Sequence, residues 1–169
     1  LLFTHSGARF VAHAEPFDAP KGEEPGAWME PPEGVRGLAP ADLAHWIDDE
    51  LWEVELEDEA RSVESYLAPR GRLLRRVVRW DAIAPAFVAL CLVRLEQMAA
   101  RAADDPRVPE QAKTGRRAAA RGDAATLAFV TASIAARALG GDALDAREAA
   151  FDAERARQSA WLARELASG

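Results

Sequence analysis

Hydrophobic and polar residues alternate in parts of the first half of the chain and recur with a helical period in the second half. In the segment "LWEVELE", Trp52, Val54 and Leu56 alternate with three glutamates. Successive side chains of a strand point to opposite faces of the sheet, whereas steps of two residues on a helix turn by about 200°. The pattern therefore predicts a strand with one apolar face and one hydrated, acidic face.

Two further patterns before residue 80 also predict strands. The N-terminal segment "LLFTHSGARFVAHAEPF" predicts two short strands joined by a turn at Ser6-Gly7. The segment "SYLAPRGRLLRRVVRW" predicts a strand near Tyr66, a bend at residues 69–71 and a strand from Arg72 to Arg79. On a shared sheet face, the arginines of this last strand could lie opposite the glutamates of the acidic strand and stabilise it.

The region between these strands is irregular. Pro and Gly interrupt residues 18–40 too often for a long element, which predicts a loop carrying Trp28 and Met29. After Pro40, the helical spacing of Leu43, Trp46 and Ile47 predicts a short helix.

The second half of the chain is rich in Ala, Leu, Arg and Glu and predicts four helices. We expect the first to begin after an N-cap at Asp81, the second to cover about 109–121, and the third to begin after an N-cap at Asp123. The glycines at 140 and 141 are expected to end the third helix, and Asp142 to open the last. Apolar residues on the expected buried faces include Val93, Leu139, Leu144 and Trp161, whereas the charged residues of the last helix, Glu154, Arg157 and Arg164 among them, are expected to be solvated.

These patterns predict an α+β fold in which a small antiparallel sheet module, residues 1–80, is followed by an antiparallel four-helix bundle, residues 81–169. A chain of 169 residues is long enough for two such modules. The formal net charge of −7 argues against a nucleic-acid-binding protein, because neutralising phosphates requires a basic surface.

Cysteine content and hydropathy indicate the compartment. Cys91 is the one cysteine, so no intramolecular disulfide forms, and its neighbours in "FVALCLV" predict a buried, unreactive thiol. The longest apolar run, "APAFVALCLV", is about half of the roughly 20 residues that a membrane span requires, and "LLFTHSGARF" lacks the features of a signal peptide. We therefore expect a cytoplasmic protein with no membrane association.

Two stretches carry a resemblance to known families. The segment "GVRGLAPADLAHWIDDELWEVELE", followed by "LAPRGRLLRRVVRWD", resembles the Trp-rich N-terminal module of an uncharacterised actinobacterial protein family. The segments "DDPRVPEQAKTGRRAAARGDAA" and "ERARQSAWLARELA" are similar to helical immunity proteins of bacterial toxin systems. The resemblance implies an association with toxin neutralisation and no reaction. In that N-terminal family His and Cys follow the Gly-Val pair, whereas Arg36 and Gly37 follow it here, so a site built on those groups is absent.

No residue pattern predicts catalysis or a metal. Glu53, Glu55 and Glu57 are expected to point the same way along a strand at intervals of about 7 Å, too far apart to share one ion. A solvated or salt-bridged face is the favoured interpretation, with a metal site or an acidic partner-binding surface as alternatives. Of His5, His13 and His45, two could meet if the first strands pair and the short helix packs on them, which would give a metal site or a general base. Incidental positions are the favoured interpretation, because the three are not clustered in the sequence.

Two functional hypotheses follow. The favoured one is a non-enzymatic cytoplasmic protein without a cofactor that binds a protein partner, as an immunity-like or accessory factor. The alternative is a small-molecule-binding domain or enzyme with a pocket between the two modules. The residues assigned to this partner or ligand site are Trp28, Trp46, Trp52 and Tyr66 as apolar walls, with His13, His45 and Arg72 as polar groups.

Overall fold

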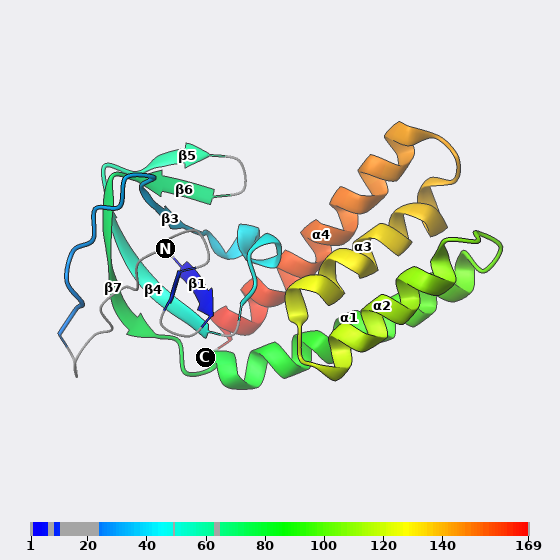
Figure 1. Ribbon diagram of the computed structural model, residues 1–169, viewed down its shortest axis with the longest axis horizontal. Coiled ribbons are helices and arrows are strands. Elements are labelled where there is room, and N and C mark those ends of the chain that lie inside the picture. The colour runs from blue at the N-terminus through cyan, green and yellow to red at the C-terminus, as the bar shows by residue number, and fades with distance from the viewer. Residues whose placement is uncertain (1, 7–8, 11–23, 49, 63–64, 169) are drawn as a thin grey trace. The chain divides into compact units, whose positions relative to one another are not determined.

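The computed structural model describes residues 2–6, 9–10, 24–48, 50–62 and 65–168, with side chains from residue 24 onward apart from that of residue 41 (Figure 1). The predicted α+β fold with four helices is confirmed. Gly7 of the turn predicted at Ser6-Gly7 and the candidate site residue His13 lie outside the described residues. The chain divides into two compact units, Leu1–Asp81 and Ala82–Gly169.

The first unit contains two antiparallel sheets. The four-stranded sheet has the order β2-β1-β4-β7, with bounds Leu2–Ser6 for β1, Arg9–Phe10 for β2, Glu50–Glu57 for β4 and Arg70–Arg76 for β7. The three-stranded sheet has the order β3-β6-β5, with bounds Val35–Gly37 for β3, Ala60–Ser62 for β5 and Ser65–Ala68 for β6.

Strand β4 has the apolar face that the sequence predicts. Val54 packs with Leu73 of β7 in a buried cluster, and Trp52 and Leu56 pack against it. Leu51 is also fully buried, although its position in the alternation places it on the face of the glutamates. The acidic face is therefore covered at the beginning of the strand and open further along.

Several elements of this unit differ from the prediction. The short helix is a 3-10 helix, η1, at Pro40–His45. Strands β3 and β5 were not predicted, and β7 begins two residues earlier than expected and ends at Arg76. Part of the expected loop is held to the sheet, because Met29 and Gly71 exchange backbone hydrogen bonds of 2.9 and 3.0 Å.

The second unit contains the four helices, which are α1 at Trp80–Arg101, α2 at Val108–Ala120, α3 at Ala124–Gly140 and α4 at Leu144–Ala167 (Figure 1). Asp123 caps α3 as predicted, because its carboxylate accepts a 3.0 Å hydrogen bond from the backbone N–H of Thr126. Asp81 is not an N-cap but lies inside the first turn of α1, and Asp142 precedes α4 by two residues.

Helices α3 and α4 approach each other closely at the α3 C-terminus. A Cβ added to Gly140 would lie 2.6 Å from the Cα of Arg147 and 2.7 Å from the carbonyl oxygen of Ala146. Only glycine fits this approach, because the neighbouring atoms are backbone and cannot rotate away. The remaining α3 core is formed by fully buried small and branched residues, Leu127, Ala128, Ala132, Ile134 and Ala135.

Some positions in the helical unit contradict the expected buried face. Val93, Leu139 and Leu144 are 59%, 48% and 69% exposed, so the apolar pattern continues onto uncovered surface. Glu154, which was expected to be solvated, is only 4% exposed. Its burial places a charged group inside the helical unit, where it requires a partner.

Helix α1 is more apolar than its longest uninterrupted run suggested. Among the described residues it is the one helix whose length and composition would allow it to cross a membrane. A core helix of similar length meets the same criterion, and Phe87, Cys91, Leu95 and Met98 form a fully buried face of α1. The expectation drawn from the run of ten apolar residues was incomplete, because α1 has no charged residue between Asp81 and Arg94 and continues beyond that run.

Candidate functional site

The glutamates of β4 pair with the arginines of β7 directly across the sheet. In the strand register, Glu53 lies opposite Arg75, Glu55 opposite Arg72, and Glu57 opposite Arg70. The first two pairs have N–O distances of 2.7 Å, and Glu57 accepts a hydrogen bond from Arg70. This hydrogen bond holds the pKa of Glu57 below its usual range. The acidic stretch therefore forms a salt-bridged ladder.

Trp28 and Arg72, two of the predicted site residues, are in contact within this ladder. The guanidinium carbons of Arg72 and Arg70 lie 4.8 and 4.9 Å from the centre of the Trp28 ring. A cation over an aromatic ring at this distance is attracted by the ring quadrupole. Trp28 thus anchors the segment before β3 to the arginines of β7.

Two other predicted aromatic residues also stack against arginines. The guanidinium carbon of Arg36 lies 4.9 Å from the centre of the Trp46 ring, and that of Arg61 lies 4.9 Å from the centre of the Tyr66 ring. Arg61 also donates hydrogen bonds of 2.5 and 2.8 Å to both carboxylate oxygens of Asp42. These bonds hold the pKa of Asp42 below its ordinary value. The aromatic faces proposed for a ligand are therefore occupied by arginines of the same unit.

The remaining predicted site residues lie at separate places in the first unit. Trp52 packs beside the Val54 and Leu73 cluster and donates a hydrogen bond of 3.2 Å to Glu50, whereas His45 is the last residue of η1 and is half-buried. The pocket expected between the two modules stays a prediction. Within the described part of the chain, no three His, Cys, Asp or Glu side chains are grouped closely enough to hold a metal ion.

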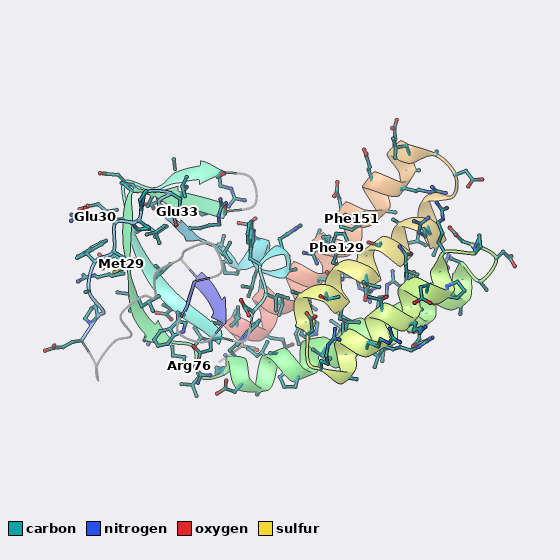
Figure 2. All side chains as sticks on the ribbon, in the orientation of Figure 1. Met29, Glu30, Glu33, Arg76, Phe129 and Phe151 are labelled. Carbon is teal, nitrogen blue, oxygen red and sulfur yellow. The ribbon has the colours of Figure 1, made fainter. Side chains whose placement is uncertain are left out.

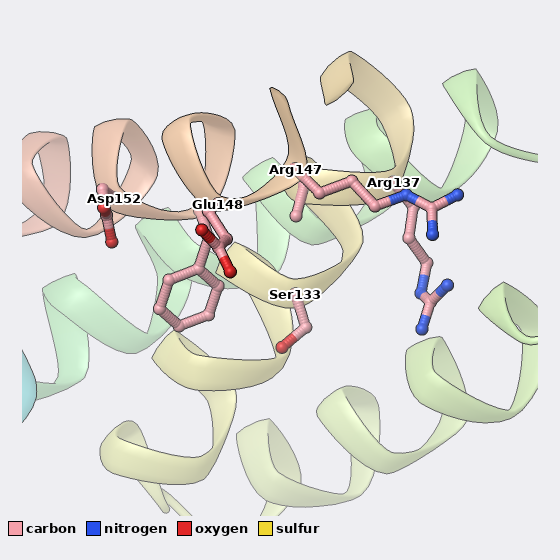
Figure 3. A pocket seen from close by; sticks show the side chains of 7 residues that line it. Ser133, Arg137, Arg147, Glu148 and Asp152 are labelled. Atoms are coloured by element: carbon pink, nitrogen blue, oxygen red, sulfur yellow. The ribbon is translucent and has the colours of Figure 1, made fainter. Parts of the chain in front are cut away.

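A shallow groove lies between α3 and α4 in the second unit. It has a volume of about 430 Å³ and is lined by Ser133, Ala136 and Arg137 of α3 and by Arg147, Glu148, Phe151 and Asp152 of α4 (Figure 3). Next to it, Phe129 and Phe151 form an edge-to-face pair with ring centres 5.6 Å apart (Figure 2). Phe129 is 56% exposed, so the pair presents an aromatic surface at one end of the groove.

The arginines of this groove have partners of their own, whereas its two carboxylates have no ion pair within the described structure. Arg137 bonds to Gln111 at 3.1 Å and to Asp105 at 3.2 Å. Arg147 donates to the carbonyl oxygen of Gly141, and Figure 3 shows both arginine side chains extending toward the same side. Glu148 and Asp152 are exposed and have no ion pair with any residue that the structure describes. We call the set of Phe129, Phe151, Glu148 and Asp152 the α3–α4 face.

A second groove lies between α1 and α4. Its volume is about 320 Å³, and it is lined by Leu90, Cys91 and Arg94 of α1 and by Glu154, Arg157, Gln158, Ala160, Trp161 and Arg164 of α4. Buried Glu154 accepts a 3.0 Å hydrogen bond from Nε of Arg94. Burial, together with the negative charge of Glu154, raises the pKa of the Cys91 thiol to about 12. The expected buried and unreactive thiol agrees with this environment.

Neither groove was identified from the sequence. Of the residues that line the α1–α4 groove, the sequence pattern assigns Trp161 to the buried face of the last helix and Glu154, Arg157 and Arg164 to its solvated face. Their spacing was the available signal, because Arg157, Trp161 and Arg164 are separated by four and three residues and so lie on one side of α4.

Comparison of the chain with models of known protein families, with curated proteins and with solved structures returns no match.

Proposed function

We propose that this chain is a non-enzymatic, cytoplasmic protein that binds a basic protein partner through the α3–α4 face, in an immunity-like or accessory role. The observation that carries the proposal is the exposed pair of Phe129 and Phe151 beside two carboxylates without ion pairs in the described structure. The immunity-like role itself comes from the resemblance of the C-terminal segments.

The composition of the face suits protein recognition. Aromatic side chains contribute large apolar area at interfaces and account for much of the binding energy where they become buried by the partner. A polar rim around such an anchor is typical of interfaces between proteins. Glu148 and Asp152 would supply that rim and favour a partner with lysine or arginine at matching positions.

The overall charge supports the same choice of partner. A net charge of −7 attracts a positively charged surface over a distance and accelerates encounter at low ionic strength. The excess of negative charge lies in the first unit, residues 1–81, which has 9 basic and 17 acidic residues, whereas residues 82–169 have 12 basic and 11 acidic residues. Attraction at the α3–α4 face itself would therefore come from Glu148 and Asp152, which are exposed.

A pull-down from the native host with matched variants tests the proposal. Phe129→Asp is expected to lower capture of the partner at least tenfold, because truncating an interface anchor typically costs about 2 kcal/mol or more. Val93→Asp is the control, because Val93 is exposed to a similar degree, 59% against 56%, but lies on α1. Loss of capture with both variants, or no partner for the unsubstituted protein, would contradict the proposal.

A further inference from the structure

We propose that the α1–α4 groove is a binding site for a small aromatic phosphate monoester, separate from the α3–α4 face. The ring of the ligand would lie against Trp161, and its phosphate would bind Arg157 and Arg164. The proposal is independent of the identity of any protein partner.

The charge of the groove favours an anionic ligand. Three arginines and one glutamate line it, which leaves two positive charges in excess in a protein whose net charge is −7. Arg94 is 19% exposed and is engaged by Glu154. Arg157 is 56% exposed and its Nη1 lies 3.9 Å from the same carboxylate, whereas Arg164 has no ion pair within the described residues. A phosphate monoester carries close to two negative charges at neutral pH and matches this excess.

The order of the side chains on α4 favours a ligand that combines a planar ring with an anionic group. Trp161 follows Arg157 by four residues and precedes Arg164 by three, so the indole lies between the two guanidinium groups along one side of the helix. The indole contacts the buried ring of Phe87, whose ring centre lies 5.7 Å away at an interplanar angle of 36°. A half-buried, supported indole flanked by cations suits a planar ring that carries an anionic group.

Two of the lining residues form an ion pair, in which Glu154 is buried and Arg94 is partly buried. A buried pair of charges pays a large desolvation cost, and apolar residues of similar volume often give equal or greater stability. The presence of the pair of Arg94 and Glu154 is therefore weak evidence for a stabilising role. Their pairing instead fixes the guanidinium of Arg94 at the groove, and Gln158 beside it is held by a 3.0 Å hydrogen bond to the carbonyl oxygen of Ala128.

The size of the groove is consistent with a compact ligand. About 320 Å³ lies at the lower end of the range of small-molecule sites. Cys91 and Leu90 form apolar lining from α1, whereas the arginines Arg157 and Arg164 are exposed at its opening. A ligand with an apolar ring and one charged end would use both kinds of surface.

Isothermal titration calorimetry on the full chain tests the proposal with phenyl phosphate as the minimal probe and adenosine monophosphate as the larger one. We expect at least one of them to bind with one-to-one stoichiometry and more tightly than inorganic phosphate, phenol or adenosine. Arg164→Gln is expected to weaken binding about tenfold, because it removes a charge-assisted hydrogen bond. Trp161→Phe is expected to weaken it less, because a smaller ring remains.

Arg121→Gln is the matched control, because Arg121 is an exposed arginine outside the groove. It is expected to leave the affinity unchanged, and circular dichroism of each variant would establish that the helices are intact. The proposal is overturned if neither aromatic phosphate binds, if inorganic phosphate binds equally well, or if Arg121→Gln weakens binding as much as Arg164→Gln. Tighter binding of tetraglutamate than of either aromatic phosphate would also overturn it, in favour of an acidic peptide.

Discussion

The sequence assigns Arg72 to a ligand site, whereas the structure places it in the ladder between β4 and β7. Replacing Arg72 tests whether it stabilises the ladder. Arg72→Ala removes the 2.7 Å ion pair with Glu55 and the contact of 4.8 Å with the Trp28 ring. A cross-strand pair of opposite charges contributes about 0.2–1 kcal/mol and an exposed cation–π contact about 0.5–1 kcal/mol. We therefore expect the free energy of unfolding to fall by about 0.7–2 kcal/mol.

Urea unfolding followed by tryptophan fluorescence measures this change, because four of the five tryptophans belong to the sheet unit. Glu55→Gln should cost only the ion-pair part, and the cycle of single and double variants should give a coupling that shrinks at high salt. Glu59→Gln, an exposed acid with no ion pair in the described structure, is the control and should leave stability unchanged. Unchanged stability in Arg72→Ala, with no coupling to Glu55, would refute the structural role of Arg72.

Three further substitutions or conditions test other parts of the structure. Gly140→Ala should lower the stability of the helical unit by about 1–3 kcal/mol in urea unfolding followed at 222 nm, because the added methyl meets the backbone of Arg147, and equal stability would contradict that close approach. Cys91 should resist Ellman's reagent at pH 8 until the protein is unfolded. Burial raises its thiol pKa from 9.0 to about 12, so between these values the thiol loses its proton more readily in the unfolded state. The free energy of unfolding should therefore decline as the pH rises from about 9 toward 12. Asp42→Asn should destabilise the protein most above pH 3.8 and progressively less below it. The hydrogen bonds from Arg61 lower the pKa of Asp42, and their contribution is lost when Asp42 is protonated. A difference in thermal midpoint that does not depend on pH would exclude this linkage.

Local sequence patterns predicted an element correctly where the residues that determine it lie within or next to that element. The alternation of Trp52, Val54 and Leu56 with glutamates predicted β4. The glutamates lie opposite the arginines of β7, as the sequence allowed. Asp123 similarly predicted the beginning of α3 through its capping chemistry. In each case the residues that determine the structure are close in sequence.

Features that depend on distant segments were not predicted. Strand β3 has three residues and is recognisable only through its pairing with β6, about thirty positions later in the chain. Leu139 and Val93 belong to helical apolar patterns, but the pattern does not show which apolar stripe another helix covers. Glu154 was assigned to a solvated face because its burial depends on Arg94, sixty residues earlier.

Dependence on distant segments also explains why the predicted site residues and the observed grooves differ. The aromatic residues of the sheet unit were chosen because tryptophan and tyrosine often line ligand pockets, but Trp28, Trp46 and Tyr66 each lie against an arginine of their own unit. The grooves of the helical unit are formed by residues from two helices each. Their existence follows from helix packing and is not encoded in any single segment.

Site-specific photocrosslinking in the native host is the most direct test of partner binding at the α3–α4 face. A photoreactive phenylalanine analogue at position 129 should form a covalent adduct with one basic protein, because the exposed ring of Phe129 would be buried by the partner. The same analogue at position 93, which is exposed to a similar degree on α1, should not form that adduct. Adducts at position 93 and none at position 129 would contradict the assignment of this face.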